Sequence, residues 1–116
     1  MKLSIKDYIG PRCISKEDGQ KIYDAIGQSV QNGETVTLDF EGVNQLAGPF
    51  FNFAIGQLLR DITEADLRRL LHIENLNSTG KLLMEKVIEN AAKCYVVKDY
   101  RKVINDILEQ QVKTFG

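Results

Sequence analysis

Two carboxylates at the end of a predicted strand are the first residues whose types and spacing suit a chemical role. Asp39 and Glu41 are separated by one residue, so on an extended chain both side chains point to the same side. Such a pair could bind a cation or act as a general base. A hard cation, however, takes about six or more oxygen ligands, and no other carboxylate or histidine stands at a defined spacing from these two. We therefore expect Asp39 to be a solvated or capping carboxylate.

The imidazole and thiol groups give no stronger pattern. His72, the only histidine, lies within the run Leu70–Ile73, where we expect a hydrogen-bonded strand histidine. Cys94 follows Lys93 without an evident base and is expected to be a small buried hydrophobic residue. Cys13 is distant from Cys94 and forms no CxxC motif with it, which favours two reduced thiols.

Phosphate-binding and catalytic motifs do not occur in the sequence. Gly42, Gly48 and Gly56 belong to no GxGxxG or Walker pattern, and no residues form a set of nucleophile, base and acid. We therefore expect a protein that is not an enzyme and that binds no cofactor and no metal. A nucleotide- or metal-binding protein that uses Asp39 and Glu41 is the weaker alternative.

The stretch 35–62 positions the candidate residues. Apolar side chains at every second position from Val36 to Phe40 predict a buried strand. Pro49 is suited to the first turn of a helix, which we predict over 50–62. Open α/β sheets are built from such strand–loop–helix units, and ligands or partners commonly meet the sheet at these loops. A functional site is therefore expected between the strand and the first turns of the helix.

Three phenylalanines at the start of this helix point in different directions. Phe50, Phe51 and Phe53 are about 100° apart per residue around a helix, so they cannot all face one core. Phe50 and Phe51 fit inward faces, and Phe53 points aside. An exposed aromatic side chain beside a Gly-Pro loop is a typical anchor for a partner, although a helix buried on all sides would place all three rings in the core. We predict a partner-binding face that comprises Asp39, Leu46, Gly48, Pro49, Phe50, Asn52 and Phe53.

The remaining sequence predicts alternating strands and helices. The helices are indicated by apolar residues that recur at helical spacing, and the strands by short β-branched or aromatic runs. Before the stretch 35–62 we predict strands over 3–5 and 12–14, and then a helix over 16–31 that is capped by Ser15 and stopped by Asn32-Gly33. After it we predict a polar connection over 63–66, a strand over 69–73, and a helix that begins between Asn75 and Thr79 and has the apolar stripe Leu83, Met84, Val87, Ile88 and Ala91. The chain is predicted to end with a strand over 95–97 and a last helix capped by Asp99, with the stripe Tyr100, Val103, Ile104, Ile107, Leu108 and Gln111. This order predicts an α/β fold with a mostly parallel sheet of about four to five strands and about four helices.

Length and charge limit the classes of function. A chain of 116 residues suffices for one domain, 1–116, and is too short for two. The formal net charge of −1, with both signs mixed, gives no basic stripe, so we expect no nucleic-acid partner and no membrane partner. No apolar run reaches the roughly 18 residues of a membrane span, and charges interrupt the N-terminus where a signal peptide needs an apolar core. We expect a cytoplasmic protein.

The segment Val36–Val43, with the sequence VTLDFEGV, resembles a strand of the STAS-like bacterial and phage proteins known as the DUF4325 group. The segments Ser15–Gly19 and Phe50–Leu59 add to the resemblance, and the order of predicted elements is similar to that of STAS domains. The best-known STAS domains are bacterial anti-sigma factor antagonists. The resemblance implies a STAS-like fold and a non-enzymatic, regulatory interaction with a protein partner that has a GHKL-type ATP site.

In the antagonists this partner phosphorylates a serine at the start of the helix that follows the strand. The corresponding positions here are Ala47, Gly48, Pro49 and Phe50, none of which has a hydroxyl group. In the antagonists, a phosphate at this position adds about two negative charges to an apolar contact surface. Because this chain has no hydroxyl group there to carry a phosphate, it cannot be switched at that position. The resemblance therefore implies the binding surface without the switch. The main alternative is a structural homodimer in which the apolar helix packs against its own copy.

Overall fold

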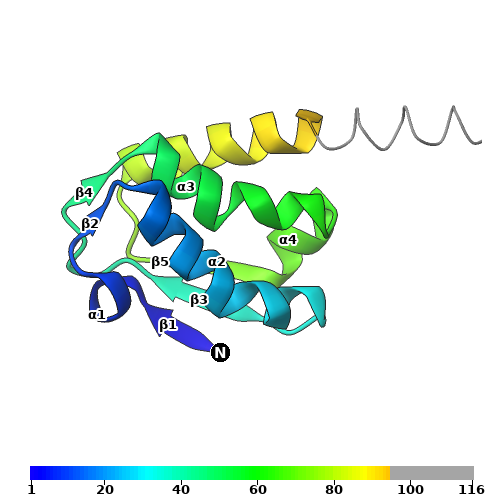
Figure 1. Cartoon of the computed structure of the whole chain (residues 1–116), viewed down its shortest axis with the longest axis horizontal. Helices are drawn as coiled ribbons and strands as arrows, with labels where there is room; N and C mark the ends of the chain where they lie inside the picture. Colours follow the sequence, from blue (N-terminus) through cyan, green and yellow to red (C-terminus); the bar gives the residue numbers. More distant parts are fainter. Residues whose placement is uncertain (95–116) are drawn as a thin grey trace, which may run out of the picture.

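A parallel three-stranded sheet organises the fold. The computed structural model describes residues 1–94. Within this range the sheet has the strand order β1-β3-β5, and β2 and β4 form a second parallel pair (Figure 1). The strands are β1 (Lys2–Ser4), β2 (Arg12–Cys13), β3 (Val36–Asp39), β4 (Gln45–Leu46) and β5 (Leu71–Glu74). The predicted α/β fold with a mostly parallel sheet is confirmed.

Helical segments connect the strands. They are α1 (Ile5–Ile9), α2 (Lys16–Gln31), α3 (Gly48–Ala54), the 3₁₀ helix η1 (Gly56–Arg60) and α4 (Glu64–Leu70). A further helix begins at Ser78 and is described as far as Cys94; we call it helix 78–94. Figure 1 shows α3 between α2 and helix 78–94, which places the segment after β4 in the middle of a helical layer.

The ends and the buried face of α2 agree with the sequence-based prediction. The Ser15 hydroxyl oxygen accepts a hydrogen bond of 3.1 Å from the backbone N–H of Asp18, and this bond satisfies a donor of the first helical turn. The helix ends at Gln31 with Asn32 as its C-cap, and Gly33 follows with a φ of +82°. The buried residues of α2 are Gly19, Ile22, Ile26, Gly27 and Val30.

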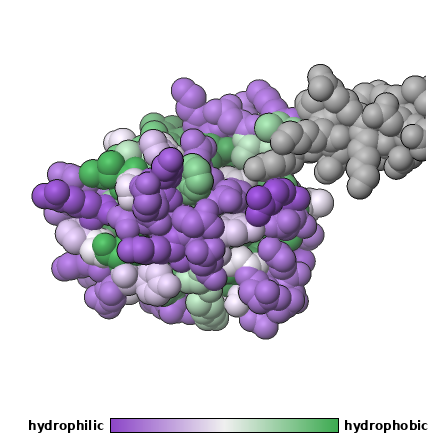
Figure 2. Space-filling view, in the orientation of Figure 1, coloured by the Kyte–Doolittle hydropathy of each residue, from purple (hydrophilic) through white to green (hydrophobic). Residues whose placement is uncertain are grey.

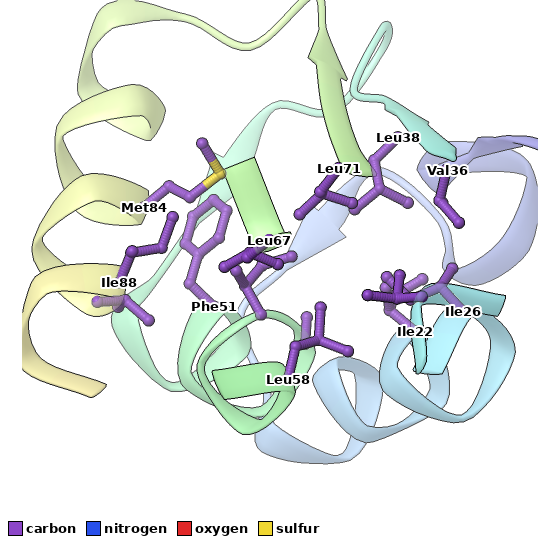
Figure 3. Close-up of a cluster of buried hydrophobic side chains, with 14 of the residues drawn as sticks. Ile22, Ile26, Val36, Leu38, Phe51, Leu58, Leu67, Leu71, Met84 and Ile88 are labelled. Atoms are coloured by element: carbon purple, nitrogen blue, oxygen red, sulfur yellow. The ribbon is translucent and has the colours of Figure 1, made fainter. Parts of the chain in front are cut away.

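The central strand β3 supplies the sheet side of the core. Val36 and Leu38 are fully buried, and Thr37 between them is partly exposed, as the alternation predicts. Figure 3 shows Val36 and Leu38 close to Ile22 and Ile26 of α2. Full burial of each such side chain contributes about 1.5–3 kcal/mol to stability, so this contact helps to hold α2 against the sheet.

Phe51 joins α3 to the other side of the core. Its ring centroid lies 6.0 Å from that of Phe40 and 5.4 Å from that of Phe50, and the Phe50–Phe51 pair is edge-to-face. In Figure 3 the side chains of Met84 and Ile88 extend from helix 78–94 toward Phe51. The predicted apolar stripe of that helix is thus confirmed as a core face.

The predicted first strand over 3–5 is wrong at its end. Strand β1 stops at Ser4, whose hydroxyl oxygen accepts a hydrogen bond from the backbone N–H of Asp7 and so caps the short helix α1. Ile5 is fully buried in the first turn of α1. The alternation of Leu3 and Ile5 suits a strand, but the cap at Ser4 competes with strand extension and starts a helix.

The single helix predicted over 50–62 is also wrong. It is divided into α3 and η1, and the turn tightens because Leu58 N donates to the carbonyl of Ile55, three residues earlier. Gly56, which has low helix propensity, lies at the division. The predicted polar connection over 63–66 instead begins α4, capped by Thr63, whose Oγ1 accepts from Asp66 N.

Two further predictions differ from the structure or lie outside it. The strand predicted over 69–73 begins two residues later, at Leu71, because Arg69 and Leu70 belong to α4. Strand β4, which pairs with β2, was not predicted, since two residues are too short for a periodic signal. The strand predicted over 95–97 and the helix predicted from Asp99 lie outside the described residues. Within residues 1–94, no helix is long and apolar enough to cross a membrane.

Candidate functional site

Helix α3 brings most of the predicted face together. It begins at Gly48, with Ala47 as the N-cap and Pro49 in the first turn, as the position of the proline predicts. The side chain of Ala47 makes no capping hydrogen bond. Leu46 and Gly48 are partly buried and Pro49 is exposed, so this loop forms the surface that leads into the helix.

The three phenylalanines separate as the helical geometry requires. Phe50 is 1% exposed and Phe51 is fully buried, whereas Phe53 is 36% exposed. The Phe50 ring therefore belongs to the core and offers no surface to a partner. Phe53 is the aromatic side chain of α3 that reaches solvent, and it remains available for contact.

A close contact between α2 and α3 fixes the orientation of Phe53. A Cβ atom built on Gly19 of α2 would lie 2.5 Å from the carbonyl oxygen of Phe50 and 2.9 Å from the Cβ of Phe53. Real Cβ atoms do not approach so closely, so this approach of the two helices requires glycine. The Cβ of Phe53 is held against α2, and the residue is still 36% exposed.

A groove lies beside Phe53, between α3 and helix 78–94. Its volume is about 450 Å³, and none of the described residues that line it is charged. Its floor is set at Gly56, where an added Cβ would lie 3.4 Å from Val87 Cγ1 and 3.7 Å from Ala91 Cβ. We call it the α3 groove; it is lined by Asn52, Phe53, Gly56, Gln57, Asn90, Ala91 and Cys94.

Hydrogen bonds hold one wall of the α3 groove in place. The Gln57 side-chain amide donates to the carbonyl oxygen of Phe53 at 2.8 Å and to the Oε1 of Gln20 at 2.9 Å. These bonds tie η1 to both α3 and α2. The groove is therefore a preformed feature with an apolar floor and amide groups at its edges.

Asp39 lies apart from this groove and has a structural role. Its Oδ1 accepts hydrogen bonds from the Asn75 side-chain amide at 2.8 Å and from the backbone N–H of Glu41 at 2.9 Å. These bonds, with the positive charge of Lys2, lower the pKa of Asp39 below its ordinary value, the Asn75 bond most of all. Asp39 thus closes the turn after β3, in line with the expected capping carboxylate.

A second hollow, of about 280 Å³, lies at the carboxyl ends of β3 and β5. It is lined in part by Glu41, Asn75 and Asn77. Asn77 already accepts a hydrogen bond of 2.7 Å from the backbone N–H of Gly80 and so caps helix 78–94. No group of three or more His, Cys, Asp or Glu side chains within residues 1–94 is arranged to hold a metal ion.

The thiols and the histidine differ in their surroundings. Cys13 is fully buried, and burial raises the pKa of its thiol to about 12, with a smaller effect from the charge of Asp18. Cys94 is exposed and lines the α3 groove, so the expectation of a buried residue is wrong. His72 is exposed on β5, opposite Thr37 of β3, and in the described part of the chain its ring makes no hydrogen bond, contrary to expectation.

Sequence reasoning missed one wall of the groove. Asn90, Ala91 and Cys94 come from helix 78–94, far along the chain from α3. Ala91 belongs to the predicted apolar stripe, but the stripe does not show which helix it faces. Figure 2 shows a mostly hydrophilic surface with small separate hydrophobic patches on the face in view.

A profile of the family described as STAS-like domain of unknown function (DUF4325) matches residues 18–81, more than half of the chain. The chain belongs to this family. No curated protein and no solved structure matches it. The matched part of this STAS-like domain runs from α2 through β5 into the start of helix 78–94, so it includes Phe53 but not Asn90, Ala91 or Cys94.

Proposed function

We propose that this STAS-like domain is a non-enzymatic, cytoplasmic, regulatory protein-binding module whose contact face is the start of α3 with the α3 groove. The observation that carries the proposal is the position of Phe53, a residue that is 36% exposed at the edge of a groove whose described lining residues are all uncharged. Aromatic anchors next to an apolar hollow supply much of the affinity of protein interfaces. Leu46, Pro49 and Asn52 complete the face.

The chemistry of this face favours a protein as its partner. An apolar side chain of the partner can bury against Phe53 and Ala91 without removing a charge from water, which keeps the desolvation cost low. Asn52, Gln57 and Asn90 supply amide groups at the groove edge for directional hydrogen bonds. The similarity to anti-sigma factor antagonists suggests a partner with a GHKL-type ATP-binding fold.

The antagonists carry a phosphorylated serine at the start of this helix, and the lack of a hydroxyl group at the corresponding positions here supports constitutive rather than switched binding. Ala47, Gly48 and Pro49 occupy the loop and first turn of α3, and none of them has a hydroxyl group. Regulation of this module therefore acts through partner availability or through another part of the chain.

A non-enzymatic role agrees with how the reactive side chains are engaged. Asp39 bonds to Asn75 and to the backbone of Glu41, and Cys13 is a buried thiol whose pKa is raised to about 12. These groups act in turns and in the core.

A capture experiment with matched variants tests the proposal. Phe53→Glu places a charge at the edge of the groove, and Tyr8→Glu makes a similar change at an aromatic residue of α1 that is 50% exposed. We expect wild type and Tyr8→Glu to capture the same protein from lysate, and Phe53→Glu to lose it while still unfolding cooperatively. With the purified partner, calorimetry should show affinity weakened by about 30-fold or more, as for loss of a major aromatic anchor.

Other results would contradict the proposal. Equal affinity of the two variants would remove Phe53 from the contact face. Unfolding of Phe53→Glu would show that the ring is needed in the core. A dimer in wild type that dissociates only in Phe53→Glu, seen by light scattering, would mean that the face serves self-association instead.

A further inference from the structure

The β2–β4 pair places an exposed apolar side chain beside the start of α3. Ile14 directly follows β2 and is 43% exposed, more than Phe53. Within the pair Cys13 lies opposite Leu46, and the backbone N–H of Ala47 donates to the carbonyl oxygen of Cys13 at 2.9 Å. Because Ile14 is the next residue after Cys13, it and the N-cap of α3 are neighbours at the surface.

Ile14 and Phe53 lie near the two ends of α3, on the side that faces α2. Phe53 is six positions beyond Ala47, which corresponds to about 9 Å along a helix axis. Its Cβ is held against Gly19 of α2, and α2 begins directly after Ile14 and the capping residue Ser15. Figure 1 shows α2 and α3 starting at the same end of the molecule, beside β2 and β4. One partner surface can therefore cover both apolar side chains, since a standard interface takes about 800 Å² from each protein.

Two positively charged side chains accompany Ile14. Arg12 precedes Ile14 by two residues on an extended chain, so both side chains point to the same side. Lys16 lies about 60° from Gly19 around α2, and Gly19 marks the face of α2 that meets α3. Arg12 and Lys16 are exposed, and neither makes an ion pair or a side-chain hydrogen bond with another residue of the stretch 1–94. Both charges are thus available to a partner.

The acidic residues at the start of α2 leave these two charges uncompensated. Asp18 is paired within the helix, with its carboxylate 3.8 Å from Lys21 Nζ. Glu17 is about 160° from Gly19 around the helix, so it lies on the side of α2 away from α3. The start of a helix also adds a partial positive charge of its own. The surface between β2 and the start of α3 therefore favours a negatively charged partner.

We infer that Ile14 is a second apolar anchor of the contact face, and that the partner presents to it an apolar side chain flanked by carboxylates. The carboxylates pair with Arg12 and Lys16 at the rim, where the guanidinium can donate two parallel hydrogen bonds to one carboxylate. A basic partner segment would bring like charges together and be rejected. The inference rests on the proposed function, because it names the partner chemistry of the same contact face.

Peptides displayed on phage provide the test, with the full-length chain as the target. A library of random peptides is selected on wild type, and the most enriched sequence is synthesised for calorimetry. We expect the enriched peptides to combine large apolar residues with aspartate or glutamate. The affinity of the synthetic peptide should fall as the salt concentration rises, because exposed ion pairs are screened.

Variants locate the site where the synthetic peptide binds. Ile14→Ser and the double reversal Arg12→Glu/Lys16→Glu should each weaken its affinity by at least about tenfold, as loss of an interface anchor or of paired charges does. The matched controls lie on helix 78–94: Leu82→Ser at a leucine that is 73% exposed, and Lys86→Glu at an exposed lysine. Both controls should bind like wild type, and urea should unfold every variant cooperatively.

Enriched peptides without acidic residues, or the absence of any enriched peptide, would overturn the inference. Equal affinities of the double reversal and Lys86→Glu would overturn it as well. If Ile14→Ser lowers stability, the double reversal still decides, because both of its positions are exposed. Loss of the peptide in Phe53→Glu alone would overturn the inference and leave the contact face at Phe53 intact. Loss in Ile14→Ser and the double reversal, with full binding in Phe53→Glu, would support the inference and remove Phe53 from the face.

Discussion

Among the single residues with reactive side chains, Asp39 has a structural role in this domain. Its carboxylate closes the turn after β3 by accepting hydrogen bonds from Asn75 and from the backbone of Glu41. Because these bonds lower the folded-state pKa of Asp39, their stabilisation is present above the ordinary pKa of an aspartate and is lost as the pH falls through the lowered value.

Replacement of Asn75 tests this role. Asn75→Gly removes the amide donor and tolerates the φ of +59° found at this position. The pKa of Asp39 should rise toward its ordinary value, and acid unfolding should begin at a higher pH. An NMR titration of the carboxyl carbon measures the first effect. Asn44→Gly, in a nearby exposed loop, should leave the pKa of Asp39 unchanged; an equal rise in that variant would contradict the assignment.

At the scale of elements, close helix packing decides which residues reach the surface. Helix α3 lies so near α2 that no Cβ fits at Gly19, and this approach buries Phe50 while it turns Phe53 outward. The division of the predicted long helix at Ile55 and Gly56 then lets helix 78–94 approach η1, with Val87 and Ala91 against Gly56. The α3 groove follows from these two contacts.

Two glycines of the same helix should respond in opposite directions. At Gly19 an added Cβ would clash with the backbone oxygen of Phe50, so Gly19→Ala should destabilise the fold by about 1–3 kcal/mol. At Gly27 the nearest atom is a Tyr23 ring carbon at 3.6 Å, an ordinary contact. Gly27→Ala should therefore stabilise the protein by about 0.5–1 kcal/mol through helix propensity.

Urea unfolding of both alanine variants measures the difference. Equal effects at the two positions would mean that α2 and α3 can move apart at no cost, and the groove would then not be preformed.

At the scale of the whole molecule, the proposed binding module predicts no response to nucleotide or metal. Any ligand at about one hundred times its Kd would add about 2.7 kcal/mol to the free energy of unfolding and raise Tm by roughly 10 °C. We expect Mg²⁺ with ATP to leave Tm unchanged in a thermal melt. A shift of that size that is lost in Glu41→Gln would favour a ligand site in the hollow at the carboxyl ends of β3 and β5 instead.

The sequence by itself determined the elements whose signals are local. The alternation from Val36 to Phe40, the Ser15 cap of α2, the proline at the start of α3 and the stripe of helix 78–94 all predict what the structure contains. The VTLDFEGV strand also identified the family that the profile match shows. These features depend on neighbours within a few residues, so periodicity and capping chemistry suffice to find them.

Competing local signals and tertiary structure decided the rest. The cap at Ser4 and the break at Gly56 have local causes, but the alternation of Leu3 and Ile5 and the apolar pattern of the predicted helix over 50–62 indicated other structures. Strand β4 exists only because β2 lies beside it. The burial of Phe50, the exposure of Cys94 and the α3 groove depend on contacts between residues far apart in the chain, which no local pattern encodes. The sequence thus determined that Phe53 differs from its neighbours, and the packing of α3 between α2 and helix 78–94 decided what surface Phe53 faces.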